Sequence, residues 1–193
     1  YACFVLLTTN AAGVLPTIVS RCQIVHFSPL PAEAIAAVLQ EKAGIGPGEA
    51  RLFASLSGGS VGAALAMAAN PEVGRRRDEA LSLLLRLGEM DDADLLEQAA
   101  AWEKEKDHLE ERLEMAAFWL RDALLVAREA PERLVVNADR LPEVRTLAGR
   151  YGGEGLVAAL ESLSRARDAL LRNGNARLVL DVLMLDLHGA ARF

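Results

Sequence analysis

The chain has 193 residues, of which 52% are hydrophobic and 25% are charged, and its formal net charge is −6. This length and composition suffice for one or two packed domains, while the acidic balance excludes nucleic-acid binding that is driven by a generally basic surface. No apolar run approaches the ~20 residues that a membrane-spanning helix needs, so we expect no membrane partner.

The N-terminal part predicts two short strands around a short helix. Residues 3–9 form an apolar run typical of a buried strand in a parallel sheet, and residues 23–27 form a second run. Between them, the Leu-Pro-Thr sequence at 15–17 opens a short helix. Two strands alone would leave most of their apolar surface uncovered, so we expect the chain to be the C-terminal part of a longer protein.

After the Ser-Pro-Leu-Pro link at 28–31, every segment predicts a helix. Three short helices are expected, with Gly44 ending the first and Ser60 capping the third. Longer helices follow, and the Asp-His-Leu-Glu sequence at 107–110 predicts a capping box for one of them. The last helix is apolar around most of its circumference, so we expect it in the centre of a bundle or against another subunit. The expected helices cover residues 32–43, 47–57, 61–69, 75–87, 92–106, 107–128, 141–150, 154–172 and 175–188.

Few residues form a pattern that indicates a catalytic, metal-binding or cofactor-binding site. Cys3 and Cys22 lie in apolar surroundings and are expected to be buried and unpaired, which favours the cytoplasm as the compartment. The three histidines, His26, His108 and His188, fall on different elements, so we expect no metal site. None of the three lysines follows the glycines of a G-x-x-x-x-G-K-[ST] phosphate loop, so we expect no cofactor in the residues present.

Two further groups are assigned structural roles. The arginine triplet at 75–77 lies next to acidic residues, which is typical of a solvated first turn of a helix rather than a contact with DNA phosphates. Trp102 and Trp119 fall at helical core spacing, so packing is the expected role of both rings.

Two motifs carry a resemblance to a known family. The sequence Ser20-Arg21-Cys22 follows the first predicted strand, and the sequence Gly-Ser-Val-Gly-Ala-Ala-Leu covers residues 59–65. In this order they resemble the AAA+ subunits of bacterial replicative clamp loaders, in particular the delta-prime family of the DNA polymerase III holoenzyme. The resemblance implies a mainly α fold: an α/β AAA+ core remnant with two short strands at 1–28, a three-helix lid module at 29–72 and a helical-bundle collar domain at 73–193.

The resemblance also implies the site residues. Thr9 and Asn10 end the strand that corresponds to sensor 1, and Ser20 and Cys22 flank Arg21 in the family's Ser-Arg-Cys motif. In the family this arginine reaches into the ATP site of the adjacent subunit, where it stabilises the charge that develops on the γ-phosphate oxygens. From the residues alone, composition favours a surface arginine near the C-terminus of a short helix for Arg21, and backbone capping for Thr9 and Asn10.

The Gly-Ser-Val-Gly-Ala-Ala-Leu sequence at 59–65, within the lid module, indicates whether such a subunit hydrolyses ATP. Subunits that do so carry an arginine where this chain has Gly62, and an aspartate where it has Ala63. The resemblance therefore implies a stator subunit without its own catalytic activity. It also implies that this subunit is part of the DNA polymerase III holoenzyme, which as a whole is a DNA-directed DNA polymerase, a nucleotidyltransferase. Its implied partners are the gamma/tau and delta subunits in a hetero-pentamer and, indirectly, the sliding clamp and primer-template DNA. Two alternatives are a gamma/tau-type ATP-hydrolysing subunit and a purely structural helical adaptor.

Overall fold

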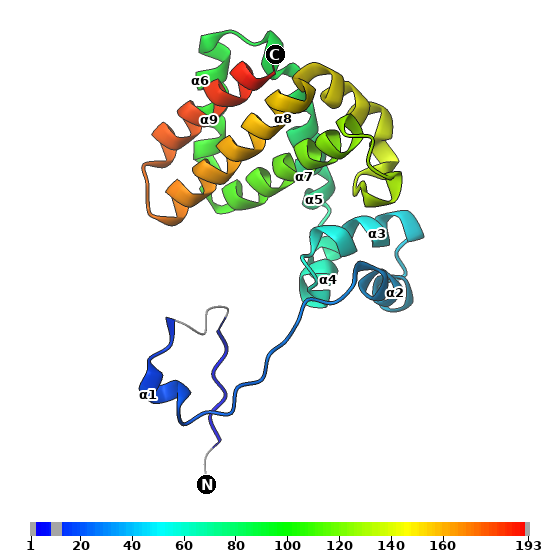
Figure 1. The fold of residues 1–193 in the computed structure, drawn as a ribbon, viewed down its shortest axis with the longest axis vertical. Helices are drawn as coiled ribbons and strands as arrows, with labels where there is room; N and C mark the ends of the chain where they lie inside the picture. The colour runs from blue at the N-terminus through cyan, green and yellow to red at the C-terminus, as the bar shows by residue number, and fades with distance from the viewer. Residues whose placement is uncertain (1–2, 9–12, 192–193) are drawn as a thin grey trace.

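Helices make up nearly all regular structure in the computed structural model, which describes residues 3–8 and 13–191 (Figure 1). Short 3-10 turns join several of the helices: η2 (Leu87–Glu89), η3 (Lys106–His108), η4 (Glu132–Leu134) and η5 (Ala138–Arg140). No helix in the described ranges is long and apolar enough to cross a membrane. The α-helices are α1 (Pro16–Val19), α2 (Ala32–Ala43), α3 (Pro47–Leu56), α4 (Val61–Ala69), α5 (Glu72–Arg86), α6 (Asp92–Lys104), α7 (Leu109–Ala127), α8 (Leu141–Leu171) and α9 (Ala176–Ala190).

The prediction of two strands near the N-terminus is wrong for the residues that the structure describes. Residues 3–8 and 23–27 form no strand, and residue 9 lies outside the described ranges. Phe4, Leu7 and Phe27 are 87%, 90% and 90% exposed. The prediction that Cys3 and Cys22 are buried is also wrong, because both thiols are free and exposed. A strand forms only when a neighbouring strand satisfies its backbone groups, and no described sheet lies against this segment.

Helices α2, α3 and α4 form a small module with its own core. The predicted bounds of the first and third helices, 32–43 and 61–69, are confirmed, as is the N-cap, whose Ser60 hydroxyl accepts a hydrogen bond from Ala63 N–H at 3.2 Å. Gly59, in the left-handed region at φ +89°, lies so close to the preceding link that an added Cβ would be 2.4 Å from Pro29 Cβ. The buried core consists of Ile35, Ala36, Leu39, Ala50, Ala54 and Ala64.

The larger bundle is built from α5 to α9. Helices α7 and α8 pack side by side, as do α8 and α9, while α6 packs on α9 and α5 on α7 (Figure 1). The last helix, for which we expect a place in the centre of the bundle or against another subunit, is enclosed on one side only: Leu183 and Leu187 are buried in the core, whereas Leu178 and Val182 are exposed. The largest fully buried side chains of this core include Leu84, Leu95, Leu113, Trp119, Tyr151 and Leu156.

Helix ends in the bundle differ from the predictions where local signals conflict. The capping box at 107–110 is wrong: Asp107 lies inside η3, and α7 begins at Leu109 without a side-chain cap. The break predicted between the helices at 141–150 and 154–172 is present as a kink within α8, where Gly152 takes the non-helical angles φ 63° and ψ 173°. Only a residue without Cβ takes that conformation at little cost, so the kink is encoded locally.

A buried polar network joins α7 to the loop that precedes α8. The carboxylate of Asp122, fully buried, accepts hydrogen bonds from Asn137 N–H at 2.7 Å, from Asn137 Nδ2 at 2.8 Å and from Val136 N–H at 3.2 Å. The Asn137 side-chain oxygen in turn accepts from Arg77 Nε on α5 at 2.8 Å. These bonds connect three segments that are far apart in the sequence, and they satisfy polar groups that would otherwise be costly to bury.

The Asp122 network predicts a dependence of stability on pH. Burial raises the pKa of the Asp122 carboxyl, although the hydrogen bonds from Asn137 and Val136 oppose that rise. The folded chain therefore retains this proton at pH values where the unfolded chain has lost it, so this contribution to stability falls as the pH rises above about 4. The measurement is the free energy of unfolding of the wild type and of Asp122→Asn, obtained from urea titrations at several pH values. We expect the difference between them, wild type minus variant, to decrease from pH 4 upward. A difference that is constant or that increases with pH would contradict the raised pKa.

Candidate functional site

The Ser-Arg-Cys motif lies on an exposed turn that continues α1. After this one-turn helix, Ser20 N–H donates to Pro16 O at 3.0 Å and Arg21 N–H donates to Ile18 O at 3.0 Å. The Ser20 hydroxyl donates to Thr17 O at 3.2 Å, so the helical turn continues into the motif. Pro16 at the first helical position favours this local turn, because its fixed φ matches a helix start.

The side chain of Arg21 is exposed and makes no hydrogen bond or ion pair with any other residue that the structure describes. Its guanidinium is therefore available, with five N–H donors in a planar fork that matches carboxylate or phosphate oxygens. In Figure 1, α1 lies well away from the helical bundle, at the end of the extended link before α2. The turn thus presents a cation with no acceptor among the described residues, which is the arrangement needed for contact with a group outside this chain.

The other predicted site residues are only partly placed. Ser20 and Cys22 lie beside Arg21 on the same exposed turn. Thr9 and Asn10 lie outside the described residues, so their relation to Arg21 stays a prediction. No group of three or more potential metal-ligating side chains occurs in the part of the chain that the structure describes.

The first turn of α4 carries Gly62 and Ala63, the positions where ATP-hydrolysing relatives of the resembled family would have Arg and Asp. Gly62 is exposed, and the nearest atom to a Cβ built there is Ser60 Oγ at 3.9 Å. A larger side chain therefore has room at this position, so steric crowding does not explain the glycine. This turn supplies no cation for a nucleotide bound beside it.

The structure corrects the prediction for the arginine triplet. Arg76 and Arg77 are only 6% and 7% exposed, so the solvated first turn applies to Arg75 alone. Arg76 forms an ion pair with Glu111 on α7 at 2.5 Å. Arg77 donates to both oxygens of Asp139 at 2.7 and 2.9 Å, and its guanidinium lies 4.9 Å from the centre of the Trp119 ring. The acceptors lie 35 and 62 residues further along the chain, where spacing within one helix cannot indicate them.

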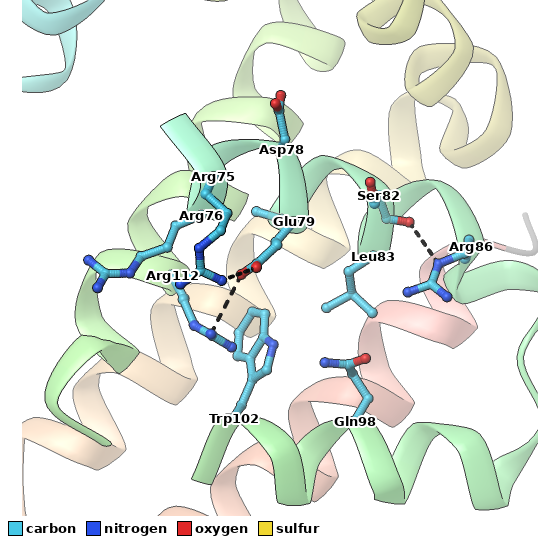
Figure 2. A pocket seen from close by; sticks show the side chains of 11 residues that line it. Arg75, Arg76, Asp78, Glu79, Ser82, Leu83, Arg86, Gln98, Trp102 and Arg112 are labelled. Carbon is cyan, nitrogen blue, oxygen red and sulfur yellow. Dashed lines mark hydrogen bonds and ion pairs between the residues drawn. The ribbon is translucent and has the colours of Figure 1, made fainter. Parts of the chain in front are cut away.

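Figure 2 shows a pocket beside this triplet that the sequence does not indicate. It has a volume of about 630 Å³ and lies between α5 and α6, with Arg112 contributed by α7. Glu79 pairs with Arg75 on the same helix and lies 3.6 Å from Arg112, which also pairs with Glu105. The pocket and the exposed Arg21 turn are separate features, since none of the pocket residues belongs to the segment before α2.

Comparisons with known proteins cover nearly the whole chain. Residues 1–31 match the family described as "DNA polymerase III, delta subunit", and residues 75–189, more than half of the chain, match the family described as "DNA polymerase III, delta subunit, C terminal". The chain is also 27% identical over 186 residues to DNA polymerase III subunit delta' of Bacillus subtilis (strain 168).

That alignment covers 95% of this chain and 56% of the relative, so the chain spans a little more than half the length of the curated protein it matches. The first matched range contains the Ser-Arg-Cys turn, and the second covers the five-helix bundle except for the first turn of α5 and the last residue of α9. On these matches, the chain belongs to the family defined by the C-terminal part of the delta subunit of DNA polymerase III.

Proposed function

We propose that this chain is part of a non-hydrolysing stator subunit of the replicative clamp loader, and that it donates Arg21 in trans to the ATP site of a neighbouring subunit during sliding-clamp loading. The single observation that carries this proposal is the exposed Arg21 turn, whose guanidinium has no acceptor among the described residues. The name of the Bacillus subtilis relative, DNA polymerase III subunit delta', supports the placement in a polymerase holoenzyme.

Physical chemistry favours an arginine for this task. Phosphoryl transfer places negative charge on the γ-phosphate oxygens, and a guanidinium supplied by another subunit stabilises that charge without titrating at physiological pH. Arg21 follows α1, a single helical turn whose backbone hydrogen bonds are all local. An arginine already paired within the chain would first have to break that pair.

The lack of a cation on α4 supports the stator role. Gly62 leaves open space where a hydrolysing subunit would place an arginine over its own nucleotide. In this proposal the residues present bind no cofactor, and the nucleotide that Arg21 contacts belongs to the neighbour. The residues from 1 to 28 then form the end of an AAA+ core, residues 29–72 the lid, and residues 73–193 the collar.

The proposed partners are the gamma/tau and delta subunits of a cytoplasmic hetero-pentamer, which contacts the sliding clamp and primer-template DNA as an assembly. The α5 to α9 bundle supplies the collar in this proposal. Its exposed apolar residues on α9, Leu178, Val182 and Leu185, are consistent with a face that meets another subunit.

The stator role is tested with the full-length protein that contains this chain. We expect the isolated protein to release no phosphate from ATP above the background rate. In sedimentation experiments it should join a complex when mixed with the ATPase and delta subunits, which would separate it from an unrelated helical adaptor. Steady ATP turnover by the isolated protein would instead identify a hydrolysing subunit, and failure to join the complex would exclude the loader role.

A further inference from the structure

The link at residues 28–31, which joins the Arg21 turn to the module of α2, α3 and α4, has a restricted backbone. Pro29 and Pro31 fix the angle φ at two of its positions, and the proline at 31 also limits the backbone of Leu30. A stiff link transmits direction along the chain. Whatever fixes it against the module therefore also sets the direction in which the segment with Arg21 leaves that module.

The turn between α3 and α4 holds this link. Leu30 N–H donates a hydrogen bond to Gly59 O at 3.0 Å. A Cβ built on Gly59 would lie 2.4 Å from Pro29 Cβ, 2.8 Å from Pro29 Cα and 3.0 Å from Leu30 N. The last two are backbone atoms, so they cannot give way unless the link itself moves. In Figure 1 the link passes the start of α4 on its way from α1 to α2. The contact therefore requires a residue without Cβ at position 59.

The turn that receives the link is itself fixed to the module. Ser57 is buried, its N–H donates to Phe53 O at 2.9 Å, and its hydroxyl donates to Ala54 O at 2.8 Å. Ser60 N–H donates to Ser57 O at 3.1 Å, and the Ser60 hydroxyl caps α4. By contrast, the segment before α2 contributes no described residue to either hydrophobic core. The contact at Gly59 thus ties a segment outside both cores to a turn held at both ends.

We propose that Gly59 is a positioning residue for Arg21: it receives the link against the α3–α4 turn and so sets the direction in which the Arg21 turn leaves the module. This inference rests on the proposed in-trans role of Arg21. It adds a residue outside the Ser-Arg-Cys motif on which that role depends. A methyl group at position 59 pushes the link off the turn and breaks the bond from Leu30. A displacement of about 1 Å at a reacting group is enough to cost ~10²-fold in rate.

Gly58 offers a matched control in the same turn. The angle φ is +59° at Gly58 and +89° at Gly59, so alanine is strained at both positions. A Cβ built on Gly58 meets no atom within 4 Å, whereas one on Gly59 meets the link. Both Gly58→Ala and Gly59→Ala therefore strain the turn, and only the second displaces the link.

The first test measures the attachment itself, without ATP or partner subunits. Hydrogen exchange of the Leu30 amide is followed by NMR in the whole chain. In the wild type it should be at least about tenfold slower than in an unstructured peptide, because the amide is bonded to Gly59 O. Gly59→Ala should remove this protection, and Gly58→Ala should keep it within about threefold. An unprotected Leu30 amide in the wild type, or an equal loss in both variants, overturns the proposal.

The second test asks whether Gly59 acts through Arg21. In the reconstituted loader with the full-length protein, Gly59→Ala should slow ATP hydrolysis at the neighbouring site at least about tenfold, and Gly58→Ala less than about twofold. If Gly59 only positions Arg21, then Gly59→Ala has no further effect when Arg21 is already alanine. A loss of the same size with and without Arg21 would indicate general damage and overturn the positioning role.

A second pair of variants reaches the same contact from the link. Leu30→Pro removes the N–H donor, whereas Leu30→Ala keeps it and truncates a side chain that is 49% exposed. We expect Leu30→Pro to slow hydrolysis at least about fivefold and Leu30→Ala less than about twofold. Wild-type hydrolysis with either Gly59→Ala or Leu30→Pro, in a loader that Arg21→Ala slows, overturns the positioning role alone. Wild-type hydrolysis with Arg21→Ala overturns the in-trans role instead, and the exchange test still decides whether Gly59 holds the link.

Discussion

Replacing Arg21 with alanine in the full-length protein is expected to reduce ATP hydrolysis at the neighbouring site of the reconstituted clamp loader by about 10³-fold. The reason is that the variant removes a guanidinium from the transition state while leaving the nucleotide site of the neighbour otherwise intact. The measurement is phosphate release by the assembled loader in the presence of primed DNA and clamp, with single-turnover rates to resolve the affected site.

Two control variants separate this effect from damage to the assembly. Arg21→Lys keeps the charge but loses the planar fork, so its rate should lie between those of the wild type and Arg21→Ala. Arg133→Ala removes an exposed arginine far along the chain, in η4, and should leave hydrolysis unchanged. Sedimentation of all three variants should show complexes of the same size as the wild type, because the Arg21 side chain makes no hydrogen bond or ion pair with the described residues. If Arg21→Ala hydrolyses ATP at the wild-type rate, the in-trans role is wrong.

Replacing Trp119 with alanine is expected to lower the free energy of unfolding by about 4 kcal/mol. The ring is fully buried at the centre of the bundle, its Nε1–H donates to Arg77 O at 3.0 Å, and the Arg77 guanidinium lies over its face. The variant leaves a cavity, and it also removes the ring face that contacts the buried Arg77 guanidinium. Urea unfolding followed by circular dichroism measures the change.

The matched substitutions for Trp119 give smaller expected losses. Trp119→Phe keeps much of the packing but loses the indole donor, so we expect a loss of about 1–2 kcal/mol. Leu171→Ala truncates a side chain that is 70% exposed and should change the free energy of unfolding by less than about 0.5 kcal/mol. A loss for Trp119→Ala as small as that for Leu171→Ala would show that the ring is not central to the core.

The helices that the sequence predicts well are those whose ends are marked by nearby residues. Gly44 takes the left-handed conformation at the end of α2, and the Ser60 side chain caps α4, so both boundaries follow from a few adjacent residues. Gly152 marks the kink in α8 in the same way. The capping box at 107–110 fails because the four-residue pattern is also compatible with the η3 turn that forms there.

Features that depend on distant parts of the chain could not be predicted in this way. The burial of Arg76 and Arg77 follows from acceptors on α7 and in the loop before α8. The strands expected at 3–9 and 23–27 need a neighbouring strand, which no local pattern can provide. For the candidate site, the motif around Arg21 was found from its residues, whereas the pocket between α5 and α6 depends on how those two helices diverge.

The central claim is that the Arg21 guanidinium enters the ATP site of an adjacent subunit. The most direct measurement is a cryo-electron microscopy structure of the assembled loader, containing the full-length protein and a non-hydrolysable ATP analogue. We predict that an Arg21 nitrogen lies about 2.8 Å from an oxygen of the neighbour's γ-phosphate, the distance of a charge-assisted hydrogen bond. A guanidinium directed into solvent, with the γ-phosphate held only by groups of its own subunit, would contradict the account.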